Sequence, residues 1–146
     1  MLLSFFVLLL ANVAIIAQQV PRENVVIEIG TATWWGFCPY AAAAADDMIA
    51  NGFDVAVMEH HVSSSGGGLT NPYAQARISY YGISGIPNSY FDGITNVLGG
   101  STGTYNQFVS KYNQRIAVPS NFNVSMNGFN DGLDYTVLVS MENVEP

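Results

Sequence analysis

The chain has 146 residues, of which 49% are hydrophobic and 10% are charged. This composition suffices for the core of one ordinary domain and part of a second, and it excludes an intrinsically disordered chain. The formal net charge is -7, from 4 lysines and arginines against 11 aspartates and glutamates. A surface this acidic repels phosphate backbones and anionic lipid headgroups. We therefore expect neither nucleic-acid binding nor peripheral membrane binding.

The chain begins with an almost wholly apolar segment, Leu2 to Ala17. This segment is shorter than the about 20 residues of a membrane-spanning helix, but it suits the apolar region of a secretory signal that ends at a small residue. No basic residue precedes it, so a retained anchor and a buried helix remain as alternatives. We predict a signal peptide over residues 1–17, export, and no membrane association after cleavage.

The next elements predict a strand, a helix and a strand. Val25 to Ile29 is a β-branched run that is typical of a buried strand. Pro39 to Ala50 is alanine-rich and is followed by Gly52, which indicates a helix and its end. A second apolar run from Phe53 to Met58 predicts a strand parallel to the first, with a right-handed crossover. Groups that follow the first strand therefore lie at its carboxyl end, where such units carry their sites.

A helix, a hairpin and a further helix follow. Asn71-Pro72 opens a predicted helix that ends at Gly82. The pair Asp92-Gly93 lies between two apolar runs and predicts a hairpin from Asn88 to Leu98. Apolar residues recur at helical spacing from Tyr105 to Ile116, so we expect this helix to pack on the sheet.

The pattern of apolar and polar residues changes after Pro119. Phe122 to Met126 and Tyr135 to Val139 alternate with period two around an Asn- and Gly-rich turn, which predicts another hairpin. Two strands alone do not form a stable unit. Either they extend the preceding sheet or, as we favour, they begin a β-sandwich that the chain does not complete. We therefore predict one domain over residues 18–118 and an incomplete β-rich domain or C-terminal hairpin over residues 119–146.

Two motifs carry a resemblance to a known family. Thr33-Trp34-Trp35-Gly36-Phe37-Cys38 is similar to the Trp-Cys-Gly-x-Cys motif of the thioredoxin family, and Tyr81 to Pro87 is similar to the segment that holds its cis-proline. With the order of elements, the resemblance covers Val25 to Val118 and implies an α/β, thioredoxin-like fold. The flanking sequence looks most like modules of bacterial secreted or outer-membrane-associated proteins, which implies a periplasmic, outer-membrane-associated or extracellular location.

The resemblance puts Trp35 where the family has its attacking cysteine. Cys38, the single cysteine of the chain, takes the position of the resolving cysteine, so no internal disulfide can form. Cys38 is the candidate catalytic residue, but we expect the chain to lack dithiol oxidoreductase activity and to need no cofactor. An alternative compares Cys38-Pro39-Tyr40-Ala41 with a monothiol glutaredoxin turn, in which Cys38 is the nucleophile, although the connection from the strand is then too long.

A second function does not depend on sulfur. Trp34, Trp35, Gly36 and Phe37 form an aromatic turn, which is the kind of surface enriched in binding hot spots. The resemblance implies that Pro87 is cis and that the backbone of Ile86 is free to pair with an extended peptide. The alternatives are an ordinary trans Pro87, and an aromatic turn in which Trp34 packs on the domain while Trp35 merely caps the turn. The candidate partners are an extended peptide and a protein thiol or disulfide.

Two further acidic or histidine positions are candidates for chemistry. Glu28 resembles the family's buried acid, a proton acceptor behind the active-site turn, although it is displaced by one residue; a partly exposed strand glutamate is the alternative. Glu59-His60-His61 is the nearest approach to a metal motif. Because adjacent strand residues point to opposite faces, we expect no metal there.

Overall fold

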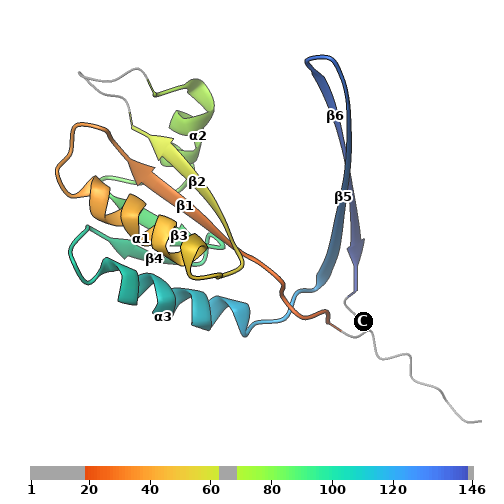
Figure 1. The fold of residues 1–146 in the computed structure, drawn as a ribbon, viewed down its shortest axis with the longest axis horizontal. Coiled ribbons are helices and arrows are strands. Elements are labelled where there is room, and N and C mark those ends of the chain that lie inside the picture. The colour runs from red at the N-terminus through yellow and green to blue at the C-terminus, as the bar shows by residue number, and fades with distance from the viewer. Residues whose placement is uncertain (1–18, 63–68, 145–146) are drawn as a thin grey trace, which may run out of the picture. The chain divides into compact units, whose positions relative to one another are not determined.

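The computed structural model describes residues 19–62 and 69–144, and the predicted signal peptide lies outside them. The chain divides into two compact units. One unit is Pro21–Pro119, and the other holds Val20 and the residues from Ser120 onward. Figure 1 follows the elements of both units along the chain.

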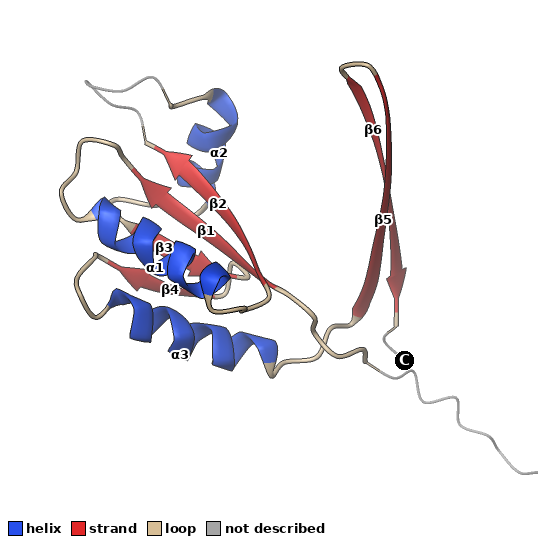
Figure 2. Ribbon diagram, viewed as in Figure 1, coloured by secondary structure: helices blue, strands red, loops and turns tan. Residues whose placement is uncertain are grey.

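Pro21–Pro119 is a mixed α/β unit built on a sheet with the strand order β2-β1-β3-β4. The sheet pairs β1 with β2 in parallel, β1 with β3 antiparallel, and β3 with β4 antiparallel. The predicted parallel crossover and the predicted hairpin are both confirmed. The strands are β1 Val25–Thr31, β2 Val55–His61, β3 Asn88–Phe91 and β4 Thr95–Leu98 (Figure 2).

The helices cover both faces of this sheet. They are α1 Cys38–Ala50, α2 Pro72–Tyr80 and α3 Thr104–Ile116. Ile27 and Ile29 of β1 belong to a buried cluster with α1 and α3, whereas Glu28 of β1 bonds to α2. Because side chains alternate along a strand, α1 and α3 pack on one face and α2 on the other. The core cluster is Val25, Ile27, Ile29, Ala41, Ala44, Ala45, Met48, Phe91, Val97 and Phe108.

Two boundaries differ from the sequence expectations. The second strand begins at Val55 rather than Phe53, because its ladder with β1 begins at Val25 opposite Val55. Phe53 packs its ring against Tyr112, with 4.9 Å between centroids. It then continues through His61, since Thr31 of β1 pairs with His61. A strand therefore ends where its neighbour ends, and the local apolar pattern does not show that point.

The hairpin turn also differs in length from a two-residue loop. Residues 92–94 separate β3 from β4, with positive φ at Asp92 (51°) and Gly93 (69°). The carboxylate of Asp92 accepts the backbone N–H of Val26 at 3.0 Å and lies 3.0 Å from Arg115 Nε. These contacts hold Asp92 in a conformation that a non-glycine residue seldom adopts.

The second unit contains β5 Phe122–Asp131 and β6 Asp134–Asn143, paired antiparallel in a sheet of their own. The predicted hairpin is confirmed, with longer strands than the alternation alone indicates. The alternative in which these strands extend the first sheet is wrong, because within the described ranges β5 and β6 pair with each other and with no strand of that sheet.

No helix in residues 19–62 and 69–144 combines the length and the apolar character that a membrane span requires.

Candidate functional site

The turn that carries the sequence motif connects β1 to α1. Phe37 is the N-cap of α1 and Cys38 its first residue, and Pro39 occupies the first turn, where a missing N–H costs nothing. The Cys38 N–H donates to the carbonyl of Trp35 at 3.0 Å, and the Tyr40 N–H donates to that of Phe37 at 3.3 Å. The turn is therefore closed by its own backbone before the helix starts.

The thiol of Cys38 lies beneath this turn. Cys38 is only 3% exposed, and its Sγ accepts the backbone N–H of Ala32 at 3.4 Å. A nucleophilic thiol must meet its target as an accessible thiolate. In this structure the thiol of Cys38 is therefore buried and not accessible to solvent.

The aromatic side chains of the turn point outward instead. Trp34, Trp35 and Phe37 are 49%, 42% and 53% exposed. The rings touch in sequence, with centroid distances of 6.0 Å from Trp34 to Trp35 and 5.9 Å from Trp35 to Phe37. A Cβ added at Gly36 would meet no atom within 4 Å, so Gly36 faces open space.

The loop before β3 brings Ile86 and Pro87 to the site. The Ile86-Pro87 peptide is cis, so the trans alternative is wrong. Pro87 is fully buried, and its carbonyl accepts the N–H of Gly99 at 2.7 Å. Among the described residues, the backbone N–H and C=O of Ile86 have no hydrogen-bond partner.

Trp34 and Ile86 line one groove of about 390 Å³. Its walls come from the turn, from the end of β2, from α2 and from the loop before β3. Among the residues that the structure describes, no acidic or basic side chain lines it. Trp35 and Phe37 lie beside Trp34 but do not line the groove. The lining residues are Trp34, Val62, Gln75, Ile78, Ile83, Ser84, Gly85 and Ile86.

Gly100 packs closely against the turn, and no local sequence pattern indicates this contact. A Cβ at Gly100 would lie 2.2 Å from the carbonyl oxygen of Phe37 and 3.1 Å from Cβ of Tyr40. Only glycine allows the backbone after β4 to approach the turn this closely. The sequence contains the pair Gly99-Gly100, which marks a place where the backbone can approach another segment closely. No pattern near this pair indicates that the other segment is the turn at Phe37.

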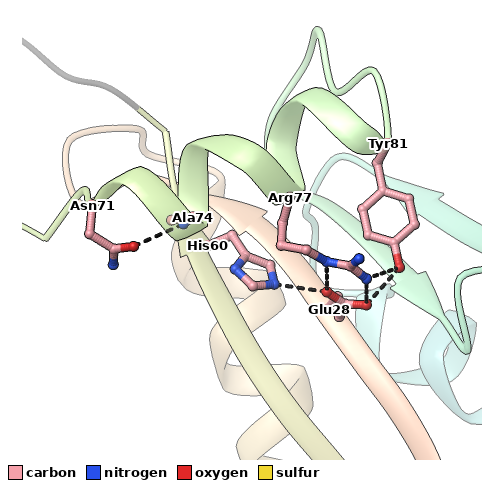
Figure 3. Close-up of polar contacts among 6 residues, drawn as sticks. All are labelled: Glu28, His60, Asn71, Ala74, Arg77 and Tyr81. Carbon is pink, nitrogen blue, oxygen red and sulfur yellow. Dashed lines mark hydrogen bonds and ion pairs between the residues drawn. The ribbon is translucent and has the colours of Figure 1, made fainter.

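Glu28 lies on the α2 face of the sheet and is not beside Cys38. Figure 3 shows its carboxylate enclosed by α2 and β2. It accepts Arg77 Nε at 2.8 Å, a second bond from Arg77 Nη2, and Tyr81 OH at 2.6 Å, and it lies 2.9 Å from His60 Nε2. Glu28 is 6% exposed, so the alternative of a partly exposed strand glutamate is wrong.

The surroundings of Glu28 stabilise its ionised form. Burial opposes the ionised form, but the hydrogen bonds from Arg77, Tyr81 and His60 outweigh it and lower the pKa of Glu28 to about 2. Burial and the bond to Glu28 raise the pKa of Tyr81 to about 12. The hydrogen bonds of Glu28 thus run to Arg77, Tyr81 and His60, and no contact within the described chain links its carboxylate to Cys38.

The histidines take separate partners. His60 contacts Glu28, whereas His61 Nε2 lies 3.7 Å from Glu59 on the same strand. In the part of the chain that the structure describes, no three histidine, cysteine or acidic side chains gather in a way that suits a metal ion.

Comparison with known proteins adds no relative: no family model, no curated protein and no solved structure matches the chain.

Proposed function

We propose that residues 21–119 form a thioredoxin-like domain whose site binds an extended peptide and does not exchange disulfides. The fold part of this proposal is supported by the strand order β2-β1-β3-β4, with α1 and α3 on one face and α2 on the other. It is supported also by the motif turn at the start of α1 and by the cis peptide directly before β3.

The absence of disulfide exchange follows from the sulfur chemistry. A dithiol enzyme attacks with one thiol and resolves the mixed disulfide with the second. Trp35 replaces the first thiol, and Cys38 is 3% exposed at the position of the second. Monothiol chemistry needs an accessible Cys38, so the same burial argues against the glutaredoxin alternative.

One observation carries the binding proposal: the unpaired backbone of Ile86 borders an uncharged groove whose other wall is Trp34. An extended peptide can pair its main chain with Ile86 and place an apolar side chain against Trp34, Ile78 and Ile83. Main-chain pairing with side-chain pockets is the general mode by which proteins bind peptides as added strands. With the predicted signal peptide, the domain would act outside the cytoplasm.

Intrinsic fluorescence tests this proposal directly, because Trp34 and Trp35 are the 2 tryptophans of the chain. We expect titration with a panel of unstructured peptides of alternating apolar and polar residues to shift the emission, with saturation for those that carry a large apolar side chain. Trp34→Ala removes one wall of the groove and should weaken binding by about tenfold or more, whereas Trp35→Ala should weaken it less.

Calorimetry on the same variants separates a loss of binding from a loss of signal. A panel that produces neither heat nor an emission change with the unmodified protein would overturn the binding proposal. Catalysed reduction of insulin by the unmodified protein, abolished by Cys38→Ser, would overturn the non-redox part of it.

A further inference from the structure

Three of the four basic residues of the chain gather around two carboxylates of the α/β unit. Arg22 and Arg115 both contact Asp92, at 3.2 Å and 3.0 Å, and Arg77 contacts Glu28 through two of its nitrogens. Three positive charges against two negative ones leave one positive charge in excess. This region is therefore cationic, although the net charge of the whole chain is -7.

A groove of about 460 Å³ connects the two ion-pair clusters. Its walls come from the residue before β1, from β1 and α2, and from the turn between β3 and β4. It shares no lining residue with the groove at Trp34. The residues that line it include Arg22, Glu28, Arg77, Tyr80, Asp92 and Gly93.

The groove presents its arginines to solvent and buries its carboxylates. The side chains of Glu28 and Asp92 are only 7% and 9% exposed, whereas those of Arg77 and Arg22 are 40% and 22% exposed. The guanidinium groups therefore lie over the carboxylates that neutralise them. A ligand in the groove meets positive charge first.

Each of these arginines uses only part of its guanidinium group. Arg77 donates from Nε and Nη2 to Glu28, and Figure 3 shows its remaining terminal nitrogen pointing away from that carboxylate. Arg22 donates from Nε to the carbonyl of Val118, and its Nη1 faces Asp92. Within the described chain, Arg77 Nη1 and Arg22 Nη2 have no acceptor. Because the paired nitrogens fix each group, these two are donors already positioned for an anion.

An exposed aromatic surface lies beside these donors. Tyr80 is 74% exposed, and the guanidinium carbon of Arg77 lies 4.8 Å from the centroid of its ring. The opposite wall includes Gly93, where an added Cβ would lie 3.1 Å from the hydroxyl oxygen of Tyr81. Glycine therefore keeps this part of the groove open for a ligand.

We propose that this groove binds a small organic carboxylate whose aromatic or apolar body lies against Tyr80. The planar fork of an arginine matches the geometry of a carboxylate. One negative charge neutralises the excess charge of the region, whereas a phosphate monoester carries almost two and would add to the repulsion within an acidic protein. The volume is within the range of small-molecule sites. This proposal does not depend on peptide binding at Trp34.

Benzoate is a suitable probe, and benzamide is its uncharged control of the same shape. We expect titration of the ¹⁵N-labelled protein, without its predicted signal peptide, to shift the amide resonances of Tyr80 and Gly93 saturably. The expected dissociation constant is on the order of 1 mM, because so small a ligand makes few contacts. Benzamide should bind at least tenfold more weakly, since it cannot accept charge-assisted hydrogen bonds from both arginines.

Three outcomes of this titration would overturn the proposal. The first is a benzoate titration without saturable shifts, and the second is equal binding of benzamide. The third is tighter binding of phenyl phosphate than of benzoate, which would assign the groove to phosphate monoesters.

Matched arginine variants test the contact with the anion. Arg22 and Arg115 share Asp92 as their partner, but only Arg22 lines the groove. Each change to glutamine removes one charge and leaves Asp92 with one arginine. We expect Arg22→Gln to weaken benzoate binding about tenfold or more and Arg115→Gln to weaken it less than about threefold. Equal effects would contradict the proposal.

A tyrosine pair gives a test that does not depend on an ion pair. Tyr80 and Tyr73 are both exposed on α2, at 74% and 85%, but only Tyr80 lines the groove. We expect Tyr80→Ala to weaken benzoate binding at least about threefold and Tyr73→Ala to leave it unchanged. Benzoate binding that Tyr80→Ala leaves intact would show that the body of the ligand does not lie against this ring.

Discussion

At the scale of single residues, the site is defined by the contrast between Cys38 and its neighbours. The thiol is buried and accepts a backbone N–H, whereas Trp34, Trp35 and Phe37 are exposed around it. The accessible surface of the turn is therefore aromatic. The sulfur contributes to the packing beneath that surface.

Two reactions test the position of Cys38. We expect iodoacetamide to modify it slowly in the native protein and completely after denaturation, because the side chain is 3% exposed. Mass spectrometry over time measures the difference. Alkylation of the native thiol at the rate of a free cysteine peptide would contradict the burial and revive the monothiol alternative.

The converse change restores the missing sulfur. Trp35→Cys puts two cysteines across the turn that the Cys38 N–H and the Trp35 carbonyl close at 3.0 Å. We expect a disulfide to form in oxidant and to be reducible by dithiothreitol, visible as a loss of both free thiols. A variant that keeps two free thiols in oxidant would count against the comparison with a Cys-x-x-Cys turn.

At the scale of elements, the position of α2 depends on one buried carboxylate. Arg77, on the middle of α2, and Tyr81, at its C-cap, both bond to Glu28 of β1. Two residues along the same strand, a Cβ at Gly30 would lie 2.7 Å from Ile83 Cδ1 and 3.1 Å from Ile78 Cδ1. The ionic contact and this close apolar contact together hold α2, Ile78 and Ile83 in the wall of the groove.

The low pKa of Glu28 predicts an acid-sensitive unit. Because the pKa falls from 4.5 to about 2 on folding, the ionised carboxylate stabilises the fold above pH 4.5, and this contribution disappears as the pH falls towards 2. Its size is on the order of 3 kcal/mol, from about 1.4 kcal/mol per pKa unit. We expect urea unfolding at several pH values to show this decline.

Glu28→Gln should lower the stability at pH 7 and flatten the decline between pH 4.5 and pH 2. Asp46→Asn, at an exposed position on α1, serves as the control and should leave both nearly unchanged. If the stability of Glu28→Gln fell with pH in the same way as that of the unmodified protein, other carboxylates would be responsible for the decline.

At the scale of the whole molecule, the two units are stabilised differently. The core cluster runs from Val25 to Phe108, and the residues packed against it end at Ile116, so this core lies within Pro21–Pro119. The hairpin has no comparable interior, since every residue from Phe122 to Asn143 is exposed.

This difference predicts that residues 19–119 fold by themselves. We expect the shortened chain to unfold cooperatively, with a melting temperature within a few degrees of that of the longer chain, measured by circular dichroism. Loss of cooperative unfolding on removal of residues 120–146 would mean that the hairpin is part of the folding unit.

Local pattern was sufficient for most elements. The β-branched run at Val25, the alanines of α1, the Asn71 cap and the Asp92-Gly93 turn each predicted an element that the structure contains, because backbone preference and burial act over a few residues. The turn with Trp34 and Trp35, and its neighbour Ile86, were identified from motif order. The structure brings Trp34 and Ile86 together in one groove.

Contacts between distant residues could not be predicted in this way. The sequence by itself determined the order of strands and helices, the single thiol and the acidic charge, since these depend on composition and on neighbours along the chain. Only the tertiary structure decided that Glu28 binds Arg77, that Gly100 supports Phe37, and that β5 and β6 form a separate sheet. Each of these depends on how segments pack in space, where shape and burial select partners that no local pattern specifies.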